Sequence, residues 1–242
     1  MKIAVAQIRP TRGDIRSNID RHRTLIDLAV PVGAELIVFP ELSVTGYEPT
    51  LANGLAMDLD DCRFDVFQNI SDAKHITLGI GAPTKSREGI CISLLLFQPR
   101  QARHLYSKMH LHPDEQSFFV HGQRSTGLIG KGANAALAIC YELSVPEHAA
   151  NASKNGAETY IASVAKAVSG IDMAITRLSQ IAHAYSMTVL MSNCVGLCDD
   201  CECAGKTSAW SKKGVLLSQL DGTTEGIIMI DTETQAVMQR TI

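Results

Sequence analysis

Apolar residues recur along this chain in two patterns. Some form short, nearly continuous runs such as 2–8, which are typical of strands buried within a sheet. Others recur at spacings of three and four, which is typical of a helix that packs by one face. Within 17–30, Ile19, Leu25 and Ile26 share such a face. Segments of the two kinds are mixed along the chain, so we expect both helices and strands.

Runs of the first kind predict strands, and segments of the second kind predict helices. The predicted strands are 2–8, 35–41, 75–83, 90–98, 101–108, 133–140, 159–165, 188–196, 214–220 and 225–232. The predicted helices are 17–30, which Ser17 would cap, 144–156, and a segment near 170–185. Residues 99–100 indicate a hairpin turn, and the last two strands are expected to form a hairpin or meander. Without a linker or repeat, this mixture predicts one layered α/β domain.

Composition narrows the possible partners. The chain has 242 residues, of which 45% are hydrophobic and 19% charged, and its net charge is −3. These values are ordinary for a soluble globular protein, and no basic run indicates nucleic acid or an anionic membrane as a partner. No apolar run approaches the roughly 20 residues that span a bilayer. The first apolar run is too short for a signal peptide, so we expect a cytoplasmic protein with seven reduced cysteines.

A single cysteine stands where a predicted strand gives way to a predicted helix. Cys140 ends the run 133–140, and Ser144 with Glu147 forms a predicted capping box for the next helix. Ligand sites of α/β proteins gather at such junctions, where backbone N–H groups and the helix dipole favour a thiolate. Taken alone, the stretch favours a buried structural thiol, which is common in protein cores.

Two further segments place charged side chains beside the ends of predicted strands. Glu41 directly follows Pro40, and Lys108 ends another strand, with Glu115 seven residues later. In isolation, Glu41 would be a solvated loop residue, and Lys108 with Glu115 an incidental surface pair. With Cys140, these side chains form a set that contains a nucleophile, a base and a cation.

Taken together, the three segments resemble the nitrilase, or carbon–nitrogen hydrolase, superfamily. The family carries a Glu in "FPE", a Lys in "K-x-H-L" and a Cys in "C-Y-D/E-x-x-x-P-E", which correspond here to Glu41, Lys108 and Cys140. Glu115 begins a stretch similar to the family's "E-x-x-x-F-x-x-G" run. The resemblance covers nearly the whole chain. It implies a single-domain, four-layer α-β-β-α sandwich over residues 1–242 that commonly forms a homodimer.

The resemblance also implies a reaction. Cys140 is expected to attack a carbonyl carbon, while Glu41 takes and returns the proton. Lys108 and the backbone N–H of Tyr141 are expected to stabilise the oxyanion, and Glu115 to keep Lys108 charged and oriented. The predicted function is a thiol hydrolase that cleaves a non-peptide C–N bond of a small linear amide or N-carbamoyl compound. It would form a thioester, use water, and need no cofactor.

The sequence leaves the substrate open. Tyr47 resembles a position that often lines the family's pocket, and Lys166 stands where relatives often carry an aromatic residue. An inward-pointing Lys166 would bind a carboxylate on the substrate, whereas an outward-pointing one would be an ordinary surface lysine. Ser144 and the stretches 164–170 and 180–186 depart from the family's patterns, and these departures concern substrate choice rather than the catalytic groups.

Four thiols gather near the end of the chain. Cys194, Cys198, Cys201 and Cys203 lie within ten residues of one another. Such density suggests zinc or an iron–sulfur cluster. Their spacing matches no standard zinc site, however, and Cys194 lies in a predicted strand. We therefore expect core and loop thiols without a metal, with a redox role as a further alternative.

Other functions stay open as alternatives. A cysteine–histidine hydrolase would use a histidine such as His110, His112, His148 or His183. The same acyl-enzyme would also serve a nitrile hydrolase, a glutaminase module, or an acyltransferase that passes the acyl group to an amine. Outside enzymes, the chain would be a metal-binding protein built around residues 194–203.

Overall fold

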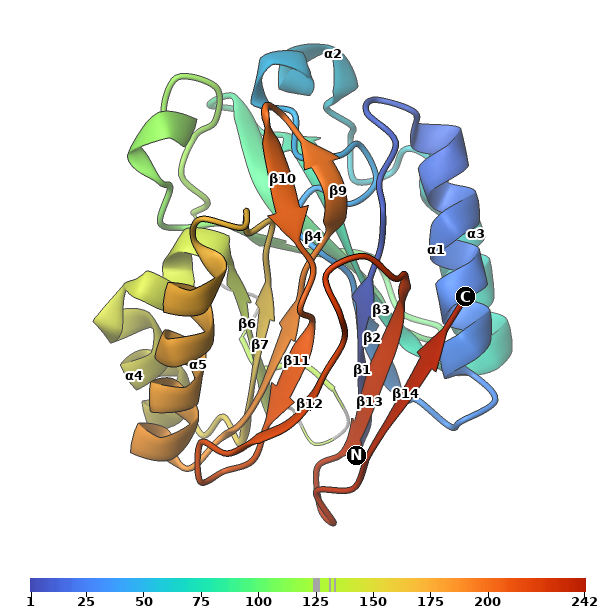
Figure 1. Ribbon diagram of the computed structural model, residues 1–242. Helices are drawn as coiled ribbons and strands as arrows, with labels where there is room; N and C mark the ends of the chain where they lie inside the picture. Colours follow the sequence, from blue (N-terminus) through green and yellow to red (C-terminus); the bar gives the residue numbers. More distant parts are fainter. Residues whose placement is uncertain (124–126, 131, 133) are drawn as a thin grey trace.

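The computed structural model describes residues 1–123, 127–130, 132 and 134–242, in which two large β-sheets pack face to face between helices and two further strands form a separate hairpin (Figure 1). The strands are β1 (Lys2–Gln7), β2 (Leu36–Val38), β3 (Thr77–Lys85), β4 (Ile90–Phe97), β5 (His104–Ser107), β6 (Ala135–Ile139), β7 (Thr159–Ser163), β8 (Thr188–Ser192), β9 (Val195–Cys198), β10 (Cys201–Ala204), β11 (Ser208–Trp210), β12 (Leu216–Gln219), β13 (Gly226–Asp231) and β14 (Val237–Thr241). The α-helices are α1 (Ile15–Ala29), α2 (Ala52–Leu55), α3 (Asp65–Lys74), α4 (Pro146–Lys154) and α5 (Ile171–Tyr185). Short 3-10 helices are η1 (Pro49–Leu51), η2 (Cys62–Phe64), η3 (Pro113–Glu115) and η4 (Cys140–Ser144).

Three apolar clusters hold the layers together. The larger sheet has the order β14-β13-β1-β2-β3-β4-β5 and the smaller one β12-β11-β8-β7-β6, and side chains such as Leu94 and Ile161 pack between them. Leu25 of α1 and Phe67 of α3 pack on the outer face of the larger sheet. Leu178 of α5 packs on the smaller sheet, which α4 also covers. The predicted four-layer α-β-β-α sandwich is confirmed.

The parallel strands of both sheets end at the same edge of the molecule. β1, β2 and β3 are parallel, and so are β6, β7 and β8. The hydroxyl of Ser163, the last residue of β7, donates to the carbonyl oxygen of Phe39, just beyond β2, at 2.8 Å. In Figure 1 this edge lies at the top, beneath the β9-β10 hairpin. Side chains that follow these strands therefore meet there.

Both predicted helix caps are wrong. α1 begins at Ile15 because the Asp14 side chain, rather than Ser17, is the N-cap, and it accepts the Ser17 N–H at 3.0 Å. α4 begins at Pro146 without a side-chain cap, and Ser144 belongs instead to η4. The reason is that the chain first forms a 3-10 turn at Cys140, and this turn includes Ser144.

The C-terminal strands also differ from the prediction. β12 and β13 are not a hairpin: β12 pairs with β11 in the smaller sheet, and β13 pairs with β1 in the larger one. The predicted strand 188–196 is divided, because β8 ends at Ser192 and β9 leaves to pair with β10. Position 133, in the predicted strand 133–140, lies outside the described residues. Helix α3 and strand β14 were not predicted: α3 is amphipathic but only ten residues long, and β14 is a mostly exposed edge strand.

In the part of the chain that the structure describes, every helix is too short or too polar to cross a lipid bilayer.

Candidate active site

Glu41 is carried by a segment that leaves β2 and passes over β3. Pro40 crosses so close to Gly81 that a Cβ on Gly81 would lie 2.1 Å from the Pro40 carbonyl oxygen. A glycine at position 81 therefore permits this path, and it leaves Glu41 almost fully buried. On the far side, His22 of α1 contacts the Ser43 hydroxyl at 2.9 Å, and burial lowers the pKa of His22 to about 4. A neutral imidazole thus supports the loop that carries Glu41.

Lys108 follows β5 and is fixed by its backbone. Its N–H donates to the Ile92 carbonyl at 2.8 Å, and its carbonyl accepts the Gly122 N–H at 2.7 Å. A Cβ on Gly122 would lie 2.3 Å from the Ser107 carbonyl oxygen, so only glycine allows the two segments to approach this closely. Gly122 ends the "E-x-x-x-F-x-x-G" stretch, and the structure explains it: the glycine holds the loop that carries Glu115 against Lys108.

Cys140 directly follows β6 and opens η4. Its φ of 44° lies in the left-handed region, which is strained for a residue with a Cβ. The tight turn leaves the side chain partly exposed to a cavity. The first N–H groups of any helix have no carbonyl partner within that helix, and the N–H of Tyr141 is one of these in η4.

The three predicted charged residues form a buried ion-pair group. The Lys108 ammonium lies 2.7 Å from Glu41 Oε1 and 2.6 Å from Glu115 Oε1. Glu115 Oε1 also accepts the Tyr47 hydroxyl at 2.9 Å, and its Oε2 accepts the His112 N–H at 2.7 Å. Glu41 Oε2 accepts no nitrogen or oxygen donor from the described residues. The structure therefore brings together side chains that are far apart in the sequence.

Burial and neighbouring charges shift the pKa values of Glu41, Lys108 and Cys140. Burial raises the pKa of Glu41, which Lys108 opposes and the neighbouring Glu115 carboxylate reinforces. It also raises the pKa of Cys140 to about 11, and the Glu41 charge adds to this shift. Burial alone would lower the pKa of Lys108, but Glu41, Cys140 and Glu115 raise it above its usual range. At neutral pH the lysine is charged and the thiol is protonated, so Cys140 needs a base that accepts its proton.

The free oxygen of Glu41 is available for this task. Glu41 Oε2 is buried without a hydrogen-bond partner in the described part of the chain, and the Cys140 thiol lies close enough to lower the pKa of this carboxylate. The cavity beside them has a volume of about 450 Å³, which suits a small molecule. Its walls include Tyr47, His112, Asp114, Glu115, Phe118, Cys140, Tyr141, Lys166, Cys198, Asp199, Cys201 and Cys203. The predicted pocket residues Tyr47, Tyr141 and Lys166 therefore lie at one site.

Glu142 is a buried carboxylate that the sequence analysis missed. Its Oε2 accepts the Ile139 N–H at 2.8 Å and the Tyr106 hydroxyl at 2.5 Å, and its Oε1 accepts the Met109 N–H at 2.6 Å. One side chain thus ties the turn that carries the cysteine to β5 and to the loop after the lysine. An acid two residues after Cys140, between apolar neighbours, was the available signal.

Replacing Glu142 with glutamine is expected to lower the free energy of unfolding by about 2–4 kcal/mol, because the amide NH₂ would face buried donors and leave one unpaired. Amide hydrolysis should fall as well, since the cysteine turn and the lysine loop would separate. Urea unfolding measures the effect. Glu147→Gln, at an exposed position of α4, is the matched control. Equal stability of the two variants would contradict this role.

The cysteine-rich segment borders the same cavity. Cys194, Cys198 and Cys203 are buried together, whereas Cys201 is exposed, and all four are free thiols. Hydrogen bonds from Cys194 and Cys203 lower the pKa of Cys198 to about 4. No three His, Cys, Asp or Glu side chains within 1–123, 127–130, 132 and 134–242 are placed to hold a metal ion.

The histidines considered as partners for the thiol lie elsewhere or face other groups. His148 lies on the buried face of α4, where its ring nitrogens contact the hydroxyls of Tyr106 and Tyr160, each at 2.8 Å. His112 lines the cavity, but its ring stacks edge-on against the Tyr141 ring at 5.2 Å between centroids. The strongest charged neighbours of the cysteine are a carboxylate and two lysines.

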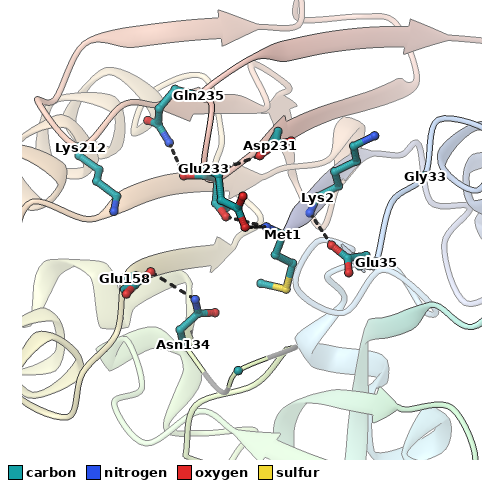
Figure 2. Close-up of a pocket in the computed structure, with 12 residues that line it drawn as sticks. Met1, Lys2, Gly33, Glu35, Asn134, Glu158, Lys212, Asp231, Glu233 and Gln235 are labelled. Atoms are coloured by element: carbon teal, nitrogen blue, oxygen red, sulfur yellow. Dashed lines mark hydrogen bonds and ion pairs between the residues drawn. The ribbon is translucent and has the colours of Figure 1, made fainter.

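A larger cavity, of about 830 Å³, lies at the opposite edge of the sheets (Figure 2). It lies at the amino ends of the strands, where Lys2, Glu35, Asn134 and Glu158 line it. Figure 2 shows these groups bonded to one another: Glu35 accepts the Lys2 N–H at 2.9 Å, and the Asn134 amide donates to Glu158 at 3.3 Å. No cysteine is among the described residues that line it. The candidate nucleophile therefore belongs to the smaller cavity alone.

Comparison with known proteins identifies a family. The family model for carbon–nitrogen hydrolases matches residues 2–240. The chain is 28% identical to an (R)-stereoselective amidase of Pseudomonas sp. over 83% of this chain and 73% of the amidase. It is 26% identical to a nitrilase of Pyrococcus abyssi over 65% of this chain and 62% of the nitrilase.

Solved structures show the same fold. An amidase from Nesterenkonia sp. AN1 superposes with a TM-score of 0.86 at 23% identity, covering 96% of this chain and 90% of that one. That amidase has been seen with the acetamide moiety of fluoroacetamide added covalently at its active-site cysteine, and another form of it in complex with butyramide. At this level of identity the likeness concerns the fold.

Proposed function

Because the chain belongs to the carbon–nitrogen hydrolase family, whose members act on C–N bonds other than peptide bonds, we propose that it hydrolyses small linear amides or N-carbamoyl compounds through a thioester on Cys140. One observation carries the proposal. The Lys108 ammonium lies between the buried carboxylates of Glu41 and Glu115, Glu41 Oε2 is buried without a hydrogen-bond partner among the residues that the structure describes, and Cys140 lies close enough to affect the pKa of Glu41.

Acylation begins when the thiol loses its proton. Glu41 takes the proton as the sulfur of Cys140 bonds to the carbonyl carbon. The charge that develops on oxygen is stabilised by the Lys108 ammonium and the Tyr141 N–H, and the loss of one such donor costs about 3–4 kcal/mol in the transition state. Glu41 then gives its proton to the leaving nitrogen. The C–N bond breaks, ammonia or an amine departs, and a thioester remains.

Deacylation uses the same groups in reverse. Glu41 takes a proton from water, whose oxygen attacks the thioester carbon. The second tetrahedral intermediate collapses, the carbon–sulfur bond breaks, and Cys140 regains its proton. Glu115 has a positioning role: its carboxylate keeps Lys108 charged, while Tyr47 and His112 fix the carboxylate itself.

Aliphatic amides are expected to release ammonia when incubated with the protein, and mass spectrometry should find the acyl group on Cys140. The test set contains acetamide, butyramide, an N-carbamoyl amino acid, and the nitrile that matches each amide. Because the chain is related to an (R)-stereoselective amidase, the test set also includes the two enantiomers of a chiral amide. Ammonia from nitriles alone would replace the proposal with nitrile hydrolysis, and no ammonia from any compound would refute it. Transfer of the acyl group to an added amine, measured in the same mixtures, would indicate an acyltransferase.

A homodimer stays part of the proposal. Val168 and Met173, near the start of α5, are 62% and 77% exposed, which leaves apolar surface available for a second copy. Light scattering of the purified protein measures the assembly.

A further inference from the structure

The charges around Cys140 do not balance when only the predicted catalytic groups are counted. Lys108 lies 2.7 Å from Glu41 and 2.6 Å from Glu115, so one cation already faces two carboxylates. When Glu41 takes the thiol proton, the negative charge moves from Glu41, which Lys108 contacts, to the sulfur, and in a region that water screens poorly a charge without a nearby partner is costly. A second positive charge close to the sulfur would therefore stabilise the thiolate.

The register of the smaller sheet places Lys166 near Cys140. Ile139, the last residue of β6, pairs with Ser163, the last residue of β7, so the residues just beyond the two strands are neighbours. The backbone of Lys166 is then held by the fully buried Asn193. The Asn193 side chain accepts the Lys166 N–H at 2.8 Å and donates to the Lys166 carbonyl at 3.2 Å. This pair of hydrogen bonds fixes where the lysine side chain begins.

The Lys166 side chain shares a cavity with the thiol. It is partly buried and lines the catalytic cavity together with Cys140, and the two side chains lie close enough for each to shift the pKa of the other. The charge of Cys140 is the largest cause of a raised pKa at Lys166, ahead of Glu41. Conversely, Lys166 lowers the pKa of Cys140 and precedes Lys108 among the groups that do so.

We propose that Lys166 is a further catalytic residue, whose ammonium stabilises the Cys140 thiolate and so leaves Lys108 to bind the substrate oxygen. The inference rests on the proposed function. It assigns the thiolate to Lys166 and the substrate oxygen to Lys108. During attack, the S–H bond breaks, the proton passes to Glu41, and the sulfur bonds to carbon, while Lys166 keeps its own proton. The competing interpretation is that Lys166 binds a carboxylate on the substrate.

Other titratable groups face the thiol or share its cavity, and they contribute to its pH dependence. They are Glu41, Tyr47, Lys108, His112, Asp114, Glu115, Tyr141, Cys198, Asp199, Cys201 and Cys203. All of them are present in wild type and in Lys166 variants alike. A difference between these proteins therefore reports on position 166.

Alkylation of Cys140 by iodoacetamide tests the proposal without turnover. Peptide mass spectrometry follows the rate from neutral to alkaline pH in wild type, Lys166→Met, Lys166→Gln and Lys166→Arg. The exposed Cys62 is the internal control. Lys166→Met and Lys166→Gln should slow alkylation of Cys140 about tenfold at neutral pH, as expected if the thiol pKa rises by about one unit. Lys166→Arg should keep most of the wild-type rate, and Cys62 should react equally in all four proteins.

Turnover of a neutral amide separates the two interpretations. If Lys166 stabilises the thiolate, kcat/KM for butyramide should fall in parallel with the alkylation rate. Unchanged alkylation, with weaker binding only of carboxylate-bearing amides, would overturn the proposal in favour of substrate recognition. Failure of the proposed function has a different signature: wild type would be alkylated at Cys140 but would hydrolyse no amide. The two proposals are therefore tested separately. Because Lys166→Met and Lys166→Gln both remove the charge, the test can still be made if one of these variants fails to fold.

Discussion

Cys140→Ala should abolish amide hydrolysis, with a fall in kcat of at least about 10⁴-fold, as is typical when a covalent nucleophile is removed. The reason is geometric as well as chemical. The left-handed turn at Cys140 places this residue on the wall of the cavity, close enough to Glu41 to affect the pKa of that carboxylate. Cys198, Cys201 and Cys203 border the same cavity.

The test measures ammonia release and covalent labelling together. Cys140→Ala should lose both activity and the acyl adduct, while Cys62→Ala, which removes an exposed thiol of the described chain, should keep both. Cys140→Ser should fold equally well but react slowly, because the hydroxyl is a weaker nucleophile. Wild-type turnover by the alanine variant would show that another group forms the acyl-enzyme, and the cysteines around the cavity would then need testing in turn.

Glu41→Gln should lower kcat by about 10²–10⁴-fold, the usual contribution of a general base. Glutamine is nearly isosteric, so the cavity should keep its shape, but the amide cannot take the thiol proton. Burial raises the pKa of Glu41, so in wild type the acid limb of kcat/KM should lie above the usual range of a glutamate. Activity appears as pH rises and Glu41 loses its proton, and this limb should vanish in the variant.

A pH–rate profile on one good amide measures this effect, with thermal melting to confirm that the variant folds. Glu88→Gln, at an exposed carboxylate, is the control for the loss of one negative charge. Near-normal turnover by Glu41→Gln with an unchanged acid limb would remove Glu41 from the mechanism. His112, which lines the same cavity, would then be the first alternative base to examine.

The long apolar runs and the polar residues that follow them were sufficient to predict much of this molecule. Strands such as 75–83 and 90–98 are correct within a few residues, because a buried strand needs apolar side chains on both faces. Glu41, Lys108 and Cys140 were identifiable since each stands at the end of such a run, and their order resembles one family. Local patterns thus identified the chemical groups and the class of fold.

The same patterns failed wherever a distant partner decides the outcome. Ser144 and Glu147 have the sequence of a helix cap, yet the chain turns earlier at Cys140, because Glu142 is drawn inward by Tyr106 and the backbone beyond Lys108. β14 has a weak apolar pattern and forms by pairing with β13. Pairing across a sheet is a long-range contact, so it leaves little trace in local periodicity.

The sequence by itself thus determined which groups this protein has for chemistry and which layers can form, because burial and strand ends depend on neighbouring residues. Only the tertiary structure decided that one lysine lies between two carboxylates, that Glu142 joins two loops, and that Lys166 lines the same cavity as the thiol. These relations depend on which strands lie side by side and on distances of a few ångströms. Coulomb energy and hydrogen bonding vary steeply over such distances, and spacing along the chain does not record them.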